Sequence, residues 1–448
     1  MTNPAPSPET ILSTLIETCL KSGASAADAS YGRSDGVSIE VHDGKLEGIE
    51  RSESQGVSLR CFFGQRQVSV SGSDTSPEGL KTLAERSVAM AQVVPEDPYC
   101  GLADTADLAT TMPDLDCSGD GEIAADILER EALEAEAAAL AVPGVKQVSG
   151  CGNGWSSSER WVAASNGFTS YKLSGSTGLG LAAVAEKDGA MERDYESRSM
   201  RRVEDRPSPA EIGRIAGERA VARLAPRKIK TQTGAVIYDR RVAGSLIGAF
   251  LSAISGPSVA RGVSFLKDAL HQQVFAPGVN LIDDPFRVRG MGSRVHDGEG
   301  RPVAPSNLIE NGELTKWLLN GASAKQLGLT PNGHASGGFG SNPGVGVSNA
   351  YLEAGDQSPA QLMAHVGKGL LVSDMFGPSI NPNTGDYSVG VAGFWFENGE
   401  IQHPVSEVTI AGDLPSMFRR LIPASDLEFR GTRDAPSVLI EDMSIAGE

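Results

Sequence analysis

The sequence predicts an α+β protein, with an N-terminal α/β half of hairpins and helices and a C-terminal half of antiparallel β-sheets with few helices. Serine–proline pairs stand where apolar helical patterns begin, and Asn-Gly or Asp-Gly pairs separate segments of strand character. Glycine is also abundant, with 53 of 448 residues, against a usual share of about 7%. Frequent glycine indicates many turns, and therefore many short strands.

Helix starts are the clearest local signal. A serine can cap the first free N–H groups, and a proline at the first helical position loses no hydrogen bond. Such pairs precede apolar helical patterns at Ser7-Pro8, Ser76-Pro77, Ser208-Pro209 and Ser358-Pro359. A further helix is predicted in "GEIAADILEREALEAEAAALA", which is rich in Ala, Leu and Glu. The segment "VIYDRRVAGSLIGAFLSAI", residues 236–254, predicts a strand that runs into an apolar helix.

Hairpins are predicted where two-residue turns interrupt strand patterns, because Asn-Gly and Asp-Gly accept the positive φ angles of such turns. These turns are Asp43-Gly44, Asn166-Gly167, Asp188-Gly189 and Asn398-Gly399. We predict three domains: an N-terminal α+β domain at 1–115, a central hairpin and helix domain at 116–226, and a β-rich domain at 227–448. No internal repeat of fixed period is visible in the sequence.

Composition excludes several classes of function. The formal net charge is −18 and aromatic residues make up 5%, so neither phosphate neutralisation nor base stacking is favoured. The five cysteines form no C-x-x-C pair, which fits a reducing compartment. The sequence shows no signal peptide and no apolar run of about 18 residues. We therefore expect a cytoplasmic protein without nucleic-acid or membrane partners.

Familiar catalytic motifs are absent. None of the six histidines is followed by Glu, and no two lie four or five positions apart, so H-E-x-x-H is excluded. There is no G-x-S-x-G elbow and no P-loop. "GLGLAA" at 178–183 matches a dinucleotide-binding pattern but falls in a predicted hairpin strand. His334 is expected to be a surface or loop histidine, and Asp283-Asp284 an ordinary turn, with a cation site or acid–base pair as the alternative.

The densest glycine signal lies in the C-terminal half, in "GHASGGFGSNPGVGVSN" and around "NPNTGDYSVGVAG". Small side chains let another backbone approach, so a cleft for an extended peptide is one interpretation. The candidates for such a peptide path are Gly337, Gly338, Gly340, Asn381, Asn383 and Asp386. The alternative is that these residues serve tight turns only.

Three segments resemble the PmbA/TldE branch of the TldD/PmbA family, historically named for modulating DNA gyrase. They are "VIYDRRVAGSLIGAFLSAISG", "NPNTGDYSVGVAGFWFENGEIQHPVSEVTIAGDL" and "PSVLIEDMSIAGE". The order of hairpins and helices agrees as well, so the resemblance covers nearly the whole chain. It implies one of two related subunits of a heterodimeric zinc metallopeptidase that acts on unfolded or leader peptides.

The resemblance also locates the place where catalysis is expected in the sister branch. TldD proteins carry H-E-x-x-x-H on the central helix, and matching the shared glycine to Gly244 puts those positions on Arg240, Arg241 and Ser245. None of these supplies an imidazole or a carboxylate base, and an arginine repels zinc. The family's late cysteine ligand is missing too, because no cysteine follows Cys151.

The resemblance therefore implies a subunit without catalytic residues, metal or cofactor of its own, with zinc in a TldD-like partner. Arg240 or Arg241 is expected to face a carboxylate of the partner or substrate, or else to be solvent-exposed or in an internal salt bridge. One alternative function is a peptidase with a cryptic site in this chain. The other is a non-hydrolytic protein that binds topoisomerase or toxin–antitoxin systems.

Overall fold

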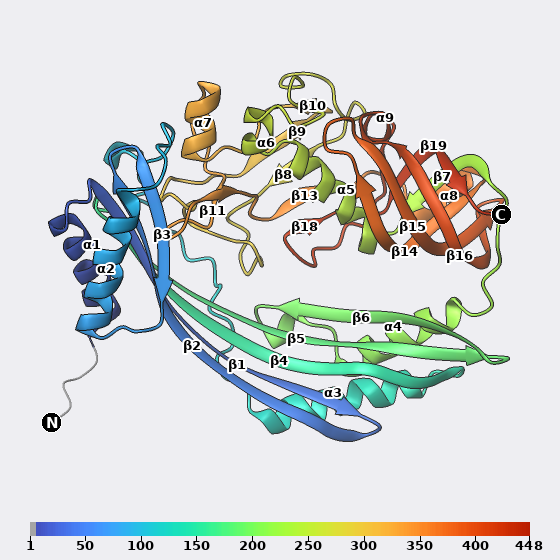
Figure 1. Ribbon diagram of the computed structural model, residues 1–448. Helices are drawn as coiled ribbons and strands as arrows, with labels where there is room; N and C mark the ends of the chain where they lie inside the picture. Colours follow the sequence, from blue (N-terminus) through green and yellow to red (C-terminus); the bar gives the residue numbers. More distant parts are fainter. Residues whose placement is uncertain (1–5) are drawn as a thin grey trace.

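A long antiparallel sheet forms the N-terminal half in the computed structural model, which describes residues 6–448 (Figure 1). Its strand order is β3-β2-β1-β4-β5-β6. The strands are β1 (Ala26–His42), β2 (Lys45–Phe63), β3 (Arg66–Gly72), β4 (Val145–Ala164), β5 (Thr169–Lys187) and β6 (Ala190–Met200). Because β1 pairs with β4, the predicted units 1–115 and 116–226 share one sheet.

Two helix pairs cover the two ends of this sheet. Helices α1 (Pro8–Lys21) and α2 (Pro77–Ala91) enclose one apolar core, and α3 (Ala125–Leu140) and α4 (Pro209–Ala222) enclose another (Figure 1). Each half of the sheet thus has the same order of helix, three strands and helix. This topological repeat escapes a search for a fixed sequence period, because the two copies differ in strand length and in the segment between them.

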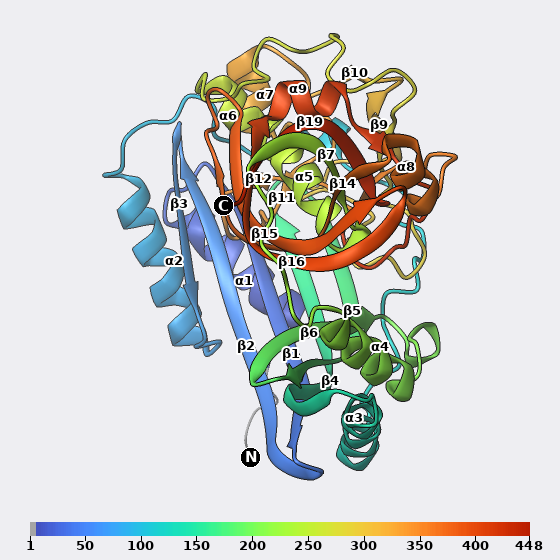
Figure 2. The ribbon, with the colours of Figure 1, turned by 90° about the vertical axis from the view of Figure 1, so that its right-hand side faces the viewer.

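The C-terminal half contains a second six-stranded sheet, ordered β16-β15-β14-β7-β19-β17, in which β16 also pairs with β19. That extra pairing closes the strands into a ring, which surrounds the helix α5 in Figure 2. Its members are β7 (Gln232–Tyr238), β14 (Lys368–Ile380), β15 (Asp386–Glu397), β16 (Glu400–Asp413), β17 (Ile422–Pro423) and β19 (Val438–Ala446). Helix α5 (Arg240–Ala253) buries Leu246, Ile247 and Phe250 in the core of this half.

Short elements complete the C-terminal half. A five-stranded sheet runs β10-β9-β8-β13-β18 and a two-stranded sheet pairs β11 with β12. The strands are β8 (Leu281–Asp283), β9 (Ser306–Glu310), β10 (Glu313–Leu314), β11 (Ala335–Ser336), β12 (Gly344–Val345), β13 (Ala350–Leu352) and β18 (Arg433–Asp434). The helices are α6 (Gly256–Ala260), α7 (Gly321–Leu327), α8 (Pro359–Val366) and α9 (Leu414–Arg419).

The sequence predictions of local structure agree with this fold. The chain is α+β, and all four serine–proline pairs begin helices in which the serine side chain accepts a backbone N–H. The four predicted turns join β1 to β2, β4 to β5, β5 to β6 and β15 to β16. Most strand pairs are antiparallel, as predicted, while β7 pairs with β14 and β13 with β18 in parallel. Within residues 6–448, every helix is too short or too polar to cross a membrane.

Candidate functional site

The first turn of α5 is held by an ion pair inside the chain. Asp239 caps the helix by accepting the N–H of Arg241. The Arg241 guanidinium donates to Asp194 on β6, with 2.8 Å between Nη1 and Oδ1. Burial disfavours the charge of Arg241, but the hydrogen bond and attraction of Asp194 outweigh it and raise its pKa above the usual value. Arg241 therefore links the C-terminal half to the edge strand of the N-terminal sheet.

Arg240 and Ser245 occupy the other two positions that were matched to the H-E-x-x-x-H motif, and both have partners within the chain. Arg240 Nη2 lies 3.0 Å from Glu428 Oε2. The Ser245 hydroxyl donates to the carbonyl oxygen of Val242, 2.6 Å away, on its own helix. Of the placements expected for the two arginines, the structure shows the internal salt bridge.

More ion pairs extend this contact along β6. Glu196 is buried and accepts guanidinium groups from Arg198, Arg219 and Arg430. These partners come from β6, α4 and the segment before β18. The surroundings of the degenerate motif are therefore a dense ionic junction, and the arginines are part of what joins the two halves.

His334 lies in a loop, as expected, but its side chain is buried there and not at the surface. Its side chain is 5% exposed, and its Nε2 lies 3.5 Å from Oδ2 of the equally buried Asp283. Asp283 ends β8 and accepts the N–H of Ser348, so it does not belong to a simple turn. Among residues 6–448, no group of three or more His, Cys, Asp or Glu side chains is arranged to hold a metal ion.

The glycine candidates for a peptide path have different environments. Gly337, Gly338 and Gly340 all have positive φ angles, as the tight-turn alternative requires. A Cβ atom on Gly338 would lie 1.8 Å from the carbonyl oxygen of Gly298. Gly340 donates its N–H to Asp28, at 2.6 Å, and so joins this loop to β1. Gly337 lines the cavity described below, and its role in a peptide path stays a prediction.

The other candidates form the tip of the β14–β15 hairpin. The Asn381 side chain accepts the N–H of Asn383, at 3.0 Å, and its own N–H donates to the carbonyl oxygen of Asp386. The Asp386 carboxylate accepts the hydroxyl of Thr384 at 2.6 Å. The structure therefore gives these residues a turn-fixing role, and it does not bring them to the cavity that Gly337 lines.

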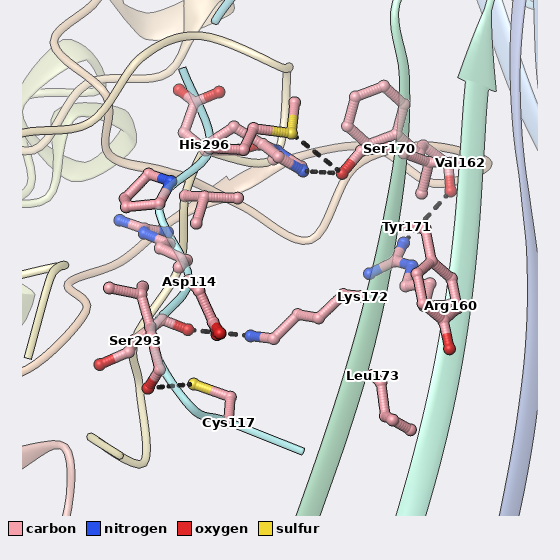
Figure 3. Close-up of a pocket in the computed structure, with 18 of the residues that line it drawn as sticks. Asp114, Cys117, Arg160, Val162, Ser170, Tyr171, Lys172, Leu173, Ser293 and His296 are labelled. Carbon is pink, nitrogen blue, oxygen red and sulfur yellow. Dashed lines mark hydrogen bonds between the residues drawn. The ribbon is translucent and has the colours of Figure 1, made fainter. Parts of the chain in front are cut away.

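A cavity of about 440 Å³ lies between the long sheet and the C-terminal half (Figure 3). Strands β4 and β5 form one wall, and the opposite walls come from three loops, at 112–118, 293–298 and 335–339. Apolar side chains contribute on several sides, among them Leu115, Val162 and Phe339. The size is typical of sites for small ligands, which usually occupy about 300–1,000 Å³.

Cations line this cavity without carboxylate partners. Lys172 Nζ reaches across it to the carbonyl oxygen of Ser293, at 2.9 Å (Figure 3). Arg160 donates to the carbonyl oxygens of Gly338 and Phe339, at 2.9 and 3.4 Å. Desolvation, together with nearby arginines, lowers the pKa of Lys172. Lys172 and Arg160 therefore form a local region of positive charge in a chain whose formal net charge is −18.

Arg294 adds to that positive charge, and each of its three guanidinium nitrogens donates to neutral acceptors, which are the hydroxyl of Ser348 and the carbonyl oxygens of Gly333, Ala335 and Gly346. Two further titratable side chains stand beside it. Burial lowers the pKa of His296, whose Nε2 lies 3.0 Å from the Ser170 hydroxyl. Desolvation raises the pKa of Asp297 to about 6.

Apart from Gly337, the residues that line this cavity were not singled out by the sequence. Arg160 and Lys172 sit in the strands "SSERWVAA" and "TSYKLSG", and His296 lies in a loop more than a hundred positions away. No spacing rule connects residues that meet only through tertiary structure. One signal could have pointed to the cavity: Arg160 and Lys172 face each other across the β4–β5 hairpin. Recognising that pair requires the register of the hairpin to be known.

Comparison with known proteins identifies the family. Residues 27–91 match domain 1 of the PmbA/TldA metallopeptidases, residues 122–224 the central domain, and residues 231–447 the C-terminal domain. The chain is 34% identical to the metalloprotease PmbA of Escherichia coli O157:H7 over 98% of its own length and 96% of that protein. The chain belongs to the PmbA/TldD family of metalloprotease-like proteins.

Solved structures share its fold. TldE from Thermococcus kodakarensis superposes with a TM-score of 0.85 at 20% identity, covering 97% of this chain and 99% of that one. A crystal structure of a Bacteroides thetaiotaomicron protein superposes with a TM-score of 0.91 at 24% identity, covering 98% and 99%. At these identities, the likeness concerns the fold.

Proposed function

We propose that this chain is the TldE-like, non-catalytic subunit of a heterodimeric zinc metallopeptidase that degrades or processes unfolded or leader peptides. Its partner is a TldD-like chain that holds the zinc ion, and the complex works in the cytoplasm. Family membership supports the peptidase class, and the acidic composition suits a protein partner better than nucleic acid.

One observation carries the assignment to the non-catalytic branch. The positions that correspond to the sister branch's zinc ligands and base hold Arg240, Arg241 and Ser245, and each has a partner within the chain. A buried guanidinium is always charged, and removing Arg241 would leave the buried Asp194 carboxylate with only the more distant Arg223, whose Nη1 lies 3.6 Å from Oδ2. These arginines therefore have a structural role, and zinc chemistry would have to come from another chain.

Co-expression with a TldD-like chain from the same genome tests the proposal. The two chains should co-purify, and an unfolded substrate such as reduced, alkylated α-lactalbumin should be cleaved by the mixture. Each chain alone should be far less active, because one lacks the metal site and the other lacks its partner surface. A chelator should abolish the activity of the mixture, and added zinc should restore it.

The controls separate this proposal from its rivals. Chelator-sensitive cleavage by the isolated chain would contradict it and favour a cryptic site in this protein. Stable binding to the TldD-like chain without any effect on cleavage would contradict the subunit role. A version of the partner with its motif glutamate changed to glutamine serves as the matched control, since it should assemble but not cleave.

A further inference from the structure

The walls of the 440 Å³ cavity contain an unusual pair of like charges. Arg160 on β4 and Lys172 on β5 are directly opposite each other in the hairpin register. Facing residues on neighbouring strands have Cβ atoms about 5 Å apart, and like charges at such positions destabilise the sheet. A neighbouring carboxylate would normally offset that repulsion.

The carboxylate that acts on Arg160 from a distance is Asp28, and it is already paired with Arg60. Within residues 6–448, neither Arg160 nor Lys172 has an acidic group within ion-pair distance, and their hydrogen bonds go to carbonyl oxygens. Nε and Nη1 of Arg160, and two of the three ammonium protons of Lys172, have no acceptor among these residues. Both side chains are accessible from the cavity, so their free donors can meet a ligand.

The acidic groups in the cavity wall are engaged elsewhere. Asp297 accepts the backbone N–H groups of Glu299 and Arg301, at 2.8 and 2.9 Å. Asp114 accepts the N–H of Asp116 at 2.9 Å. A third cation, Arg294, adds to the positive field of the cavity. The balance of free groups therefore favours an anion, and a carboxylate matches the hydrogen-bonding pattern of a guanidinium.

Apolar groups beside the cations narrow the choice of ligand. Val162 on β4 and Phe339 in the facing 335–339 loop are 6% and 4% exposed, and Leu173 follows Lys172 on β5. A free phosphate would leave this apolar surface empty, whereas a hydrophobic residue with a carboxylate would use both parts. The volume also exceeds that of an inorganic anion and suits a peptide end.

We propose that this cavity binds the C-terminal end of a peptide, with the free α-carboxylate on Lys172 and Arg160 and an apolar last side chain against Val162 and Phe339. This rests on the proposed function, because it takes peptides to be the ligands. It adds a subsite in the chain that lacks the zinc motif, so that this chain would hold the end of a substrate or product.

Titration calorimetry on the isolated chain tests the subsite. The probe is N-acetyl-Ala-Ala-Phe with a free carboxylate, compared with its C-terminal amide. A charge-assisted hydrogen bond contributes enough that the amide should bind at least about tenfold more weakly. N-acetyl-Ala-Ala-Glu amide, which carries its carboxylate on a side chain, should also bind at least about tenfold more weakly than the free acid.

Variants assign the carboxylate to its residues. Lys172→Met and Arg160→Gln should each weaken binding of the free acid by about tenfold or more. Lys187→Met, at the far end of the same strand, should not change it. Equal binding of acid and amide by the unaltered chain overturns the proposal, and so does equal binding of the side-chain carboxylate or unchanged affinity in both variants. None of these results affects co-purification with a TldD-like chain, so the two proposals fail separately.

Discussion

Arg241 on the central helix and Asp194 on the edge strand of the N-terminal sheet form a buried ion pair, with 2.8 Å between Nη1 and Oδ1. The two side chains are 8% and 3% exposed. A pair in such a setting contributes less to net stability than its Coulomb attraction suggests, but loss of one partner is costly because the other stays buried and charged. The junction between the halves therefore depends on keeping both.

The two arginines at the H-E-x-x-x-H positions differ in burial, with Arg241 8% exposed and Arg240 35% exposed. Arg241→Ala should lower the free energy of unfolding by about 3 kcal/mol, because Asp194 loses its closest partner. Arg240→Ala should lower the free energy of unfolding by less than about 1 kcal/mol, because the Arg240 and Glu428 side chains are 35% and 32% exposed. Urea unfolding of both variants measures the difference. Equal losses would mean that the Asp194 pair has no special role.

The isolated chain is expected to bind no stoichiometric zinc. The reason is the guanidinium pair of Arg240 and Arg241 at the positions where the sister branch has its ligand and base, since fixed positive charge repels a divalent cation. Elemental analysis of protein purified without chelators or a metal-affinity tag gives the content directly. About one tightly held zinc ion per chain would contradict the assignment to the non-catalytic branch.

Asp297 should make stability depend on pH. Its pKa in the folded chain is about 6 because of desolvation, against about 3.9 for an ordinary aspartate. The folded state therefore binds the proton more tightly, so this contribution is complete below about pH 4 and is lost as the pH rises through about 6. Relative to Asp297→Asn, the unaltered chain should lose about 1 kcal/mol of unfolding free energy between pH 5 and 7.

Urea unfolding at both pH values checks this, with Asp386→Asn as a control at an exposed turn. That control should follow the unaltered chain at both pH values. If the difference between the unaltered chain and Asp297→Asn stays constant, or grows in the opposite direction, Asp297 does not carry the excess proton.

Local chemistry made much of the fold predictable. A serine before Pro209 caps a helix start, and a glycine after Asp188 permits the positive φ angle of a hairpin turn, so helix starts and turns follow from neighbouring residues. The cavity was not predictable in this way, because Lys172 and Ser293 meet only when the long hairpins lie against the C-terminal loops. The burial of His334 escaped prediction for the same reason: its polar neighbours correctly indicated a loop, but not that this loop packs beside Asp283.

Two glycines of the 337–346 segment, Gly338 and Gly344, differ in whether the structure leaves room for a side chain. At Gly338 the φ angle is +76°, and a Cβ atom would lie 1.8 Å from the carbonyl oxygen of Gly298. At Gly344 the φ angle is ordinary and the nearest atom, the Ser336 carbonyl oxygen, is 4.0 Å away. Gly338→Ala should therefore cost more than the roughly 1–2 kcal/mol of a left-handed residue, because the backbone must also move. Gly344→Ala should be nearly neutral.

Thermal and urea unfolding of the two alanine variants compare these costs in the same loop. Partner binding and peptide cleavage should fall in Gly338→Ala only as far as its loss of folded protein explains, since the contact joins two loops of this chain. If Gly338→Ala were as stable as Gly344→Ala but failed to support cleavage, Gly338 would have to lie on the path of the peptide. With the present geometry we expect the opposite: a stability defect at Gly338, and unchanged function in the fraction of Gly338→Ala that folds.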